Sequence, residues 1–459
     1  MKTSISQRLC LLLTAGALVS STSQVLAAEP PPAAGDFRGV VASARDKVFP
    51  TVVYIKVMVE SFDSGRKEII SAGGSGVLIS EQGEILTNWH VIDKAVEVRC
   101  LLSDGRSYDA QVVGSDKDID VALLQLELDE GAESLPYAEL GGSSELVEGD
   151  FVMAMGAPWG MSRSVTIGII SCVDRYLPDT SEYSLWLQTD AAISPGNSGG
   201  PLVDTDGRVI GLNTRGVMMG GDLGFAVPAD TIRELLPRLR EKGQIPWTYT
   251  GIQLQPLRDF ERDMYFDGDT GVIVAHVEQA SPAEAAGLRP RDRLLAIDGN
   301  DVTGLTYEDL PAIRRMLGTL DEQTDTTLQI QRGSETQELT LTPRAKGDTQ
   351  GKEKEFPRWD FAAKTINQFD NPSLFFHREK GVFISGVSSP GNAMKAGLRR
   401  DDILSKINGK DVESLDDLQT LHDEAMEGID SKHRVLVEVL RNGLTRQIVL
   451  DFSRDYERD

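Results

Sequence analysis

A serine flanked by glycines is the strongest candidate nucleophile in this sequence. Residues 196–202 read Gly-Asn-Ser-Gly-Gly-Pro-Leu, with Ser198 as the third residue. A serine hydroxyl is a weak nucleophile at neutral pH, so its attack requires a histidine that accepts the proton and a carboxylate that orients the imidazole. Of the five histidines, His90 alone precedes residue 276. We therefore expect Ser198 to be the nucleophile and His90 to be its general base.

Three aspartates that follow His90 are candidates for the orienting carboxylate. Asp116, Asp118 and Asp120 lie in a charged turn before the apolar run at residues 121–124. Asp120 directly abuts this expected strand, so packed backbone would hold its side chain, whereas Asp116 and Asp118 are expected in solvent. The pattern therefore favours Asp120.

The glycines around Ser198 fit the needs of acyl transfer. Two backbone N–H groups must converge on a carbonyl oxygen that becomes negatively charged in the transition state. Gly196 permits the necessary turn, and the expected donors are the N–H groups of Gly196 and Ser198. A glycine-rich turn alone is weak evidence, because an ordinary loop has the same composition. Together with His90 and Asp120, it predicts a catalytic triad.

Short β-rich segments must position these residues. From residue 48 to about residue 227 such segments alternate with turns rich in Gly, Asp and Ser, which is typical of a β-sandwich or β-barrel. An amphipathic helix is predicted from about Ala229, with Asp230 as its N-cap, to Gly243. This helix indicates a domain boundary.

The remaining chain contains an internal repeat at a shift of 110 residues. Residues 271–302 align without gaps with residues 381–412, and each copy holds an Ala-Gly-Leu triplet. Such agreement indicates two duplicated domains. The polar residues 344–355 lack apolar periodicity and are predicted to form a flexible linker, with a boundary near residue 350.

The length and charge of the chain limit its possible functions. Its 459 residues suggest three domains, since one domain usually takes about 100–200 residues. The chain has 71 acidic and 47 basic residues, and its net charge of -24 would repel nucleic acids and anionic lipids. We therefore expect no nucleic-acid partner.

The first 28 residues have the features of a secretory signal peptide. Lys2 and Arg8 give a basic start, residues 9–19 form an apolar core, and small residues follow. The apolar core is shorter than the roughly 20 residues that span a bilayer, so no integral membrane span is expected after cleavage; an uncleaved anchor is the alternative. Cys100 and Cys172 remain, and we expect inert core thiols rather than a disulfide.

Six motifs in a fixed order resemble the HtrA (Deg) family of serine proteases. They are residues 73–77, 87–91, 120–124, 189–193, 196–202 and 224–228. The resemblance covers nearly the whole mature chain and implies a mainly β fold, with a chymotrypsin-like double β-barrel followed by two α+β PDZ domains. On that basis the first barrel contributes His90 and Asp120, and the second contributes Ser198.

The resemblance also gives domain boundaries. We expect a signal peptide at residues 1–28, a trypsin-like protease domain at 37–243, a first PDZ domain at 244–345, a linker at 346–355 and a second PDZ domain at 356–453.

Substrate preference follows from the same resemblance. Enzymes of this fold that cleave after Lys or Arg carry an Asp six residues before the nucleophile, where this chain has Ala192. An apolar pocket for small or medium aliphatic side chains is expected instead, formed by Ile193, Leu223 and Ala226.

Each repeat resembles a PDZ domain, which binds a C-terminal peptide as an added strand and holds its carboxylate in a turn of backbone amides. In the first repeat the implied binding loop is Tyr249, Thr250, Gly251 and Ile252, with the helix near residues 307–317 as the opposite wall.

The second repeat departs from this pattern at the same loop. Phe361 replaces the glycine, and Asp360 adds a negative charge beside a site for a carboxylate. We therefore predict that the first repeat binds peptides and that the second mainly arranges subunits or substrate. The alternative is that both repeats are spacers.

The combined interpretation is an ATP-independent serine endopeptidase of the periplasm that degrades unfolded or misfolded proteins. Neither an ATP-binding loop nor a His-Glu-x-x-His motif occurs, so no cofactor or metal is expected. The resemblance implies a homotrimer or larger homo-oligomer and a possible chaperone activity. Cage contacts that need a long loop are in doubt, since residues 60–72 form a short one. A holding chaperone that cleaves little and a peptide-binding adaptor without catalysis are the alternatives.

Overall fold

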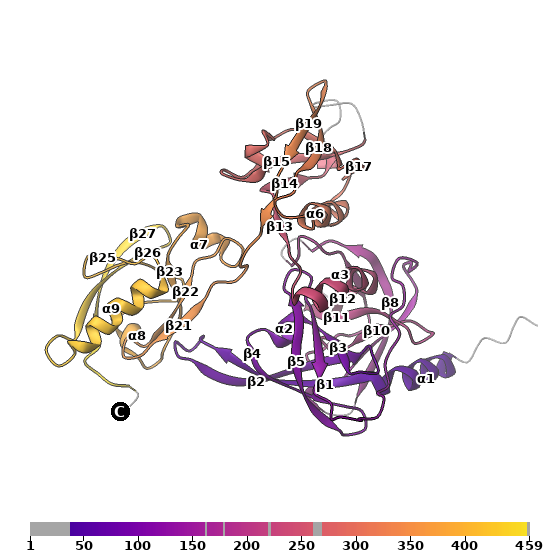
Figure 1. Cartoon of the computed structure of the whole chain (residues 1–459). Coiled ribbons are helices and arrows are strands. Elements are labelled where there is room, and N and C mark those ends of the chain that lie inside the picture. The colour runs from indigo at the N-terminus through magenta and orange to yellow at the C-terminus, as the bar shows by residue number, and fades with distance from the viewer. Residues whose placement is uncertain (1–36, 161–162, 178–179, 219–221, 260–268, 457–459) are drawn as a thin grey trace, which may run out of the picture.

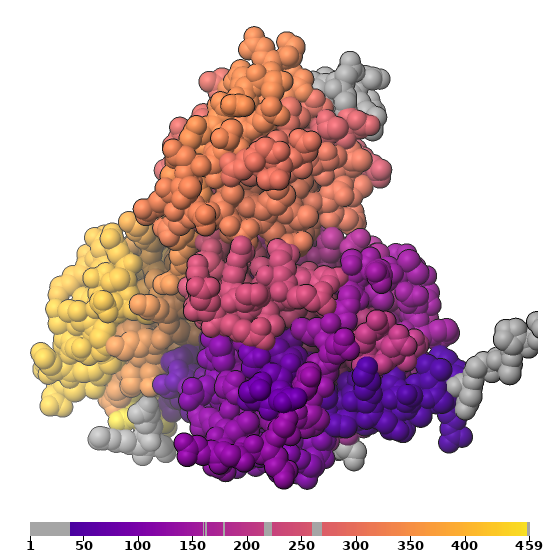
Figure 2. Space-filling model, turned by 45° about the vertical axis from the view of Figure 1, so that its right-hand side comes forward, coloured from indigo at the N-terminus to yellow at the C-terminus, as the bar shows by residue number. Residues whose placement is uncertain are grey.

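The computed structural model describes residues 37–160, 163–177, 180–218, 222–259 and 269–456. The expected signal peptide lies outside these ranges. Within them, two β-barrels are followed by the two repeats, which confirms the predicted mainly β architecture. The first repeat sits on the barrels and the second lies beside them (Figures 1 and 2). Among the described residues, no helix is long and apolar enough to cross a membrane.

The first barrel closes in the strand order β1-β2-β3-β6-β5-β4. Its side chains alternate between the interior and the surface, and Ile55, Ile85 and Leu124 are among the fully buried ones. Helix α1 and a short 3-10 helix, η1, precede the barrel, and helix α2 follows β3. The bounds are α1 (Phe37–Val48), η1 (Phe49–Thr51), β1 (Val52–Ser61), β2 (Glu68–Leu78), β3 (Glu84–Thr87), α2 (Trp89–Ile92), β4 (Ala95–Leu101), β5 (Ser107–Asp116) and β6 (Val121–Leu126).

The second barrel closes in the order β10-β11-β12-β9-β8-β7. Its bounds are β7 (Phe151–Gly156), η2 (Pro158–Gly160), β8 (Ser164–Arg175), β9 (Trp186–Thr189), β10 (Pro201–Val203), β11 (Val209–Met218) and β12 (Asp222–Pro228). Cys100 in the first barrel and Cys172 in the second are both free, and Cys100 is buried as expected, whereas Cys172 is only partly buried. Burial raises the pKa of Cys100 to about 12, so this thiol is unreactive.

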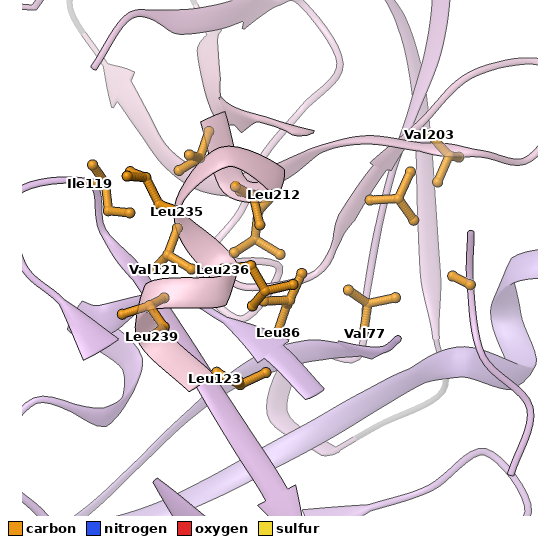
Figure 3. Close-up of a cluster of buried hydrophobic side chains, with 14 of the residues drawn as sticks. Val77, Leu86, Ile119, Val121, Leu123, Val203, Leu212, Leu235, Leu236 and Leu239 are labelled. Carbon is orange, nitrogen blue, oxygen red and sulfur yellow. The ribbon is translucent and has the colours of Figure 1, made fainter. Parts of the chain in front are cut away.

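Helix α3 (Ala229–Lys242) joins the two barrels. Leu235, Leu236 and Leu239 pack in one apolar cluster with strand residues of both barrels (Figure 3). The helix ends where predicted, because Gly243 adopts a left-handed φ of 72° and donates its N–H to the Leu239 carbonyl. Asp230 does not cap the helix as expected. Its carboxylate instead accepts the amides of Ser143 and Ser144, at 2.8 Å each.

The two repeats have matching strands. The strands β15 (Val272–Val277) and β16 (Arg293–Ile297) of the first repeat map onto β23 (Val382–Val387) and β24 (Ile403–Ile407) of the second at the 110-residue shift. Each copy also buries an aspartate against an arginine: Asp292 pairs with Arg332 at 2.7 Å, and Asp402 pairs with Arg441 at 2.6 Å.

The first repeat comprises β13 (Thr248–Tyr249), β14 (Ile252–Gln255), η3 (Leu257–Asp259), β15 (Val272–Val277), α5 (Pro282–Ala285), β16 (Arg293–Ile297), β17 (Asn300–Asp301), η4 (Tyr307–Asp309), α6 (Leu310–Gly318), β18 (Thr326–Arg332), β19 (Glu335–Leu341) and β20 (Arg344–Ala345). The second comprises β21 (Glu353–Phe356), β22 (Phe361–Thr365), α7 (Pro372–His377), β23 (Val382–Val387), α8 (Asn392–Ala396), β24 (Ile403–Ile407), β25 (Lys410–Asp411), α9 (Leu415–Glu427), β26 (Arg434–Arg441) and β27 (Leu444–Asp451).

The expected flexible linker is ordered at both ends, so this expectation is wrong. Strand β20 pairs with β13 at its start, and β21 pairs with β22 at its end. The charged residues that suggested flexibility have partners in the first barrel: Lys346 lies 2.8 Å from Asp118, and Glu353 lies 2.8 Å from Lys94.

Asp116 is buried rather than in solvent, which corrects a second expectation. Its carboxylate accepts the Ile119 amide at 3.0 Å and the Trp247 indole N–H at 2.7 Å. The Trp247 ring stacks on Tyr183 at 4.1 Å. Asp116 therefore ties the turn before Asp120 to the start of the first repeat. Burial, and then the negative charge of Asp118, raise the pKa of Asp116 to about 7.

This buried carboxyl should make stability depend on pH. Because the pKa of Asp116 is raised from 3.8 to about 7, the folded chain keeps the proton between about pH 4 and 7, where the unfolded chain releases it. The free energy of unfolding should therefore fall as pH rises through this window. Asp116→Asn should reduce the difference in the free energy of unfolding between pH 5 and pH 8 by on the order of 1–3 kcal/mol.

The measurement is urea unfolding at the two pH values, with tryptophan fluorescence as the signal that reports unfolding. Asp129→Asn, at an exposed position, is the matched control and should keep the wild-type pH dependence. Equal pH dependence in wild type and Asp116→Asn would contradict the assignment.

Candidate active site

His90 lies at the start of α2, immediately after strand β3. Its Nδ1 is 2.9 Å from each carboxylate oxygen of Asp120, and its backbone amide donates to the same carboxylate at 3.1 Å. A proton on Nδ1 satisfies the carboxylate and leaves Nε2 free to accept one. The imidazole is one-third exposed, at 34%, so a substrate can reach it.

Asp120 is held from several directions. It has a left-handed φ of 54° and is 3% exposed. The buried Asn88 amide group donates to its carbonyl at 2.9 Å, and the Thr214 hydroxyl donates to its side chain. A buried carboxylate with these donors can stabilise a charged imidazole.

Ser198 lies between β9 and β10 of the second barrel. Its hydroxyl donates to the Thr214 carbonyl at 2.7 Å, and its own carbonyl accepts the Ser75 amide at 2.8 Å. Among the described residues, no hydrogen bond joins Ser198 to His90. The hydroxyl must therefore give up its bond to the Thr214 carbonyl before it can donate its proton to His90.

Thr214 is the site residue that the sequence did not reveal. Its carbonyl accepts the Ser198 hydroxyl, and its hydroxyl donates to Asp120. No motif marks this position, which lies in the middle of β11. Thr214 stands at an irregularity of β11, because the register against β12 shifts between Asn213 and Arg215 and leaves Thr214 without a partner in that ladder.

The loop before Ser198 requires its glycines. Gly196 has a φ of 99°, and its carbonyl accepts the Ser75 hydroxyl at 2.6 Å. Gly199 has a φ of 82°, and a Cβ there would collide with the Ser75 carbonyl and the Thr87 hydroxyl. The amides of Gly196 and Ser198 donate to no other residue in the described ranges, so both are free to bind a substrate oxygen.

The three predicted pocket residues differ in burial, although Ile193 packs against the cluster that contains Ala226. Ile193 is partly buried, and Leu223 is 36% exposed. Ala226 is fully buried and packs in the core of the second barrel, so its side chain does not line an open pocket. Gly224 is closer to the expected place, because a Cβ there would lie 2.9 Å from Ile193 Cδ1.

The four predicted residues of the first repeat's peptide loop lie at one cleft of 1430 Å³, which residues 249–255 line. Tyr307, Arg314 and Leu317 line the same cleft, and α7 of the second repeat adds Phe375 and Phe376. Strand β14 is the edge of its sheet. Gly251 has a φ of 77°, and a Cβ there would collide with Ser281.

The described part of the chain contains no group of three or more His, Cys, Asp or Glu side chains that could hold a metal ion.

Three family models match the chain. A model described as a trypsin-like peptidase domain matches residues 74–212, and two PDZ domain models match residues 248–342 and 383–428. These matches confirm the expected combination of a protease domain with two PDZ domains.

Curated relatives are named probable periplasmic serine endoprotease DegP-like. The relative from Halomonas elongata is 34% identical over 403 residues, which cover 85% of this chain and 81% of the relative. The relative from Hahella chejuensis is 34% identical over 395 residues, which cover 83% of this chain and 80% of the relative.

Solved structures similar to this chain are also proteases. The HtrA-type protease AlgW, solved with a tripeptide, is 32% identical with a TM-score of 0.59, over 67% of this chain and 97% of that chain. A serine endoprotease from Yersinia pestis is 28% identical with a TM-score of 0.50, over 66% of this chain and 97% of that chain.

The bridging position of Thr214 can be tested with an isosteric change. Thr214→Val removes the hydroxyl that donates to Asp120 and keeps the backbone carbonyl that holds Ser198. A hydrogen bond to a charged group contributes about 1.5–3 kcal/mol, so kcat/KM for casein hydrolysis should fall about 10- to 100-fold. Thr214→Ser keeps the hydroxyl and should stay within a few-fold of wild type. Wild-type kcat/KM in Thr214→Val would refute the bridging role.

Proposed function

This chain belongs to the HtrA-type, DegP-like serine endoproteases, and we propose that it degrades unfolded or misfolded proteins with Ser198, His90 and Asp120 as its catalytic triad. It is a serine endopeptidase by family. The single observation that carries the triad is the pair of 2.9 Å contacts between His90 Nδ1 and the buried Asp120 carboxylate.

Hydrolysis begins when the Ser198 hydroxyl turns from the Thr214 carbonyl towards His90 Nε2. Nε2 accepts the proton while Oγ attacks the scissile carbonyl, and Asp120 stabilises the resulting imidazolium. His90 then donates the proton to the leaving amine, which leaves an acyl-enzyme on Ser198. Water, deprotonated by the same nitrogen, releases the acyl group.

The amides of Gly196 and Ser198 are the proposed donors to the substrate oxyanion. Both are unpaired among the described residues, and the left-handed turn at Gly196 is fixed by the Ser75 hydroxyl. Donors that are already in place need no reorganisation when negative charge develops, which makes this a large part of the rate enhancement.

The proposed pocket for the residue before the scissile bond is small and apolar. Ala192 places no charge there, and Ile193 packs against Gly224. We therefore propose cleavage after small or medium aliphatic residues, with Leu223 at the rim.

The first repeat is proposed to bind C-terminal peptides. Strand β14 is the last strand of its sheet and can accept an added strand, and the loop from Tyr249 to Ile252 lines the cleft. Binding there would hold a substrate chain, or an activating peptide, beside the protease barrels. The HtrA-type protease AlgW was likewise solved with a tripeptide.

The proposed location is the periplasm, and the proposed assembly is a homotrimer or a larger homo-oligomer. The curated relatives are named periplasmic, which agrees with the signal peptide read from the sequence. A supplementary chaperone activity remains part of the proposal, with proteolysis as the main one.

Ser198→Ala should abolish proteolysis. Casein cleavage should fall by on the order of 10⁴-fold or more, because no other group can form the acyl-enzyme. Ser194→Ala changes an exposed serine in the same loop and should retain wild-type activity. Neither ATP nor EDTA should alter the wild-type rate. Equal turnover in Ser198→Ala and wild type would exclude Ser198 as the nucleophile.

Gly251→Ala should block the peptide site of the first repeat. Both the left-handed φ and the collision with Ser281 oppose a side chain at this position. Binding of a fluorescent peptide with a free aliphatic C-terminus should weaken at least about 10-fold by anisotropy. Gly287→Ala is the matched control, since Gly287 has a φ of 82° with open space around it. Equal loss in both variants would point to general destabilisation instead.

A further inference from the structure

The two repeats differ at the strand edge that a PDZ ligand would use. In the first repeat β14 is the last strand of its sheet, so one edge is free. The 110-residue shift places β14 on β22 of the second repeat, where β21 is already paired with that edge. The pairing is antiparallel and sets Glu353 opposite Lys364 and Phe356 opposite Phe361.

Strand β21 occupies the place and direction of a PDZ peptide. A bound peptide runs antiparallel to the edge strand, between that strand and a helix, with its C-terminal end at the carboxylate loop. The end of β21 lies beside the corresponding loop, residues 357–360. On its other side is α9, whose His422 Nε2 lies 2.7 Å from the Pro357 carbonyl. Figure 1 shows α9 beside β21 and β22.

Phe356 fills the apolar pocket at the end of this groove. Its side chain is fully buried, with its ring 5.5 Å from that of Phe361 and 5.6 Å from that of His422. The ring of Trp359 also packs against Phe356, with 6.4 Å between the two ring centroids. This is the position in which the last side chain of a peptide ligand would lie, so an external peptide has no room there.

The loop that would receive a carboxylate presents a carboxylate itself. Asp360 is 2% exposed and accepts the Asn392 amide at 2.8 Å. Its other oxygen lies 3.1 Å from Nη2 of Arg66, in the turn between β1 and β2 of the first barrel. The loop thus binds a guanidinium from the protease domain where its counterpart would bind an anion.

The β1–β2 turn fits this surface closely at the backbone. A Cβ on Gly65 would collide with the Ser388 amide, and a Cβ on Gly386 would collide with the Phe62 carbonyl. The contact continues along β21, where Glu355 accepts the Lys67 amide at 2.7 Å. Strand β21 is therefore held by the second repeat on one side and by the protease barrel on the other.

We propose that residues 353–357 are a built-in ligand of the second repeat, and that the surface completed by this segment binds the β1–β2 turn of the protease domain. The second repeat is then closed to C-terminal peptides and acts as an intramolecular clamp on the first barrel. The partner it recognises is an arginine-bearing turn rather than a free carboxylate.

Amide hydrogen exchange of the unmodified full-length chain tests the built-in ligand. Without added peptide, the amides of residues 353–356 and 361–365 should exchange roughly 100-fold more slowly than those of residues 252–254 in β14. The probe is a synthetic Gly-Lys-Glu-Lys-Glu-Phe peptide with a free carboxyl terminus, which copies residues 351–356. An excess should leave exchange at 361–365 unchanged. Fast exchange at 353–356, or slowing at 361–365 by the probe, would overturn the proposal.

A second experiment tests the clamp. Arg66→Ala removes the guanidinium from Asp360, and exchange at residues 62–65 and 386–388 should accelerate about 10-fold or more. Arg45→Ala, which removes an exposed pair with Asp46, is the matched control and should change neither segment. Unchanged exchange at both segments in Arg66→Ala would show that the turn is not bound through Asp360.

Discussion

The buried carboxylate of Asp120 is the point at which the two barrels become one enzyme. It lies in the first barrel beside His90, yet the hydroxyl that donates to its second oxygen belongs to Thr214 of the second barrel. The same Thr214 holds the nucleophile through its carbonyl. Correct geometry therefore depends on how the barrels sit against each other, which the leucines of α3 fix by packing with strands of both. The geometry of the catalytic residues thus depends on the packing of the two barrels against each other.

Sequence reasoning identified the residues whose type and local motif the expected reaction requires. His90, Asp120 and Ser198 could be found because acyl transfer restricts the residue types, and the 110-residue repeat could be found because duplication preserves spacing. Thr214 and Asp116 could not, since each acts through partners more than 90 positions away in the chain. The linker was misjudged for the same reason: charged residues indicate solvent only until a distant opposite charge is found, as for Lys346 and Asp118.

One substitution accounts for much of the divergence between the repeats. Gly251 adopts a left-handed φ of 77° and lies too close to Ser281 for a side chain. Phe361 stands at the same place of the second repeat and begins strand β22, while Asp360 takes the left-handed position with a φ of 59°. Strand β21, which precedes this loop, forms a hairpin with β22 and covers the edge that in the first copy is the last edge of the sheet.

The short pairing between β13 and β20 brings the entry and the exit of the first repeat to one place, with Thr248 opposite Ala345. The residues just outside this pair, Trp247 and Lys346, are both anchored on the turn before Asp120. In architectural terms the first repeat is an insertion, a cassette on a two-strand stem. Evolution can exchange or delete such a cassette, and an engineer can graft another recognition module onto the stem, while the catalytic barrels and the second repeat keep their connection.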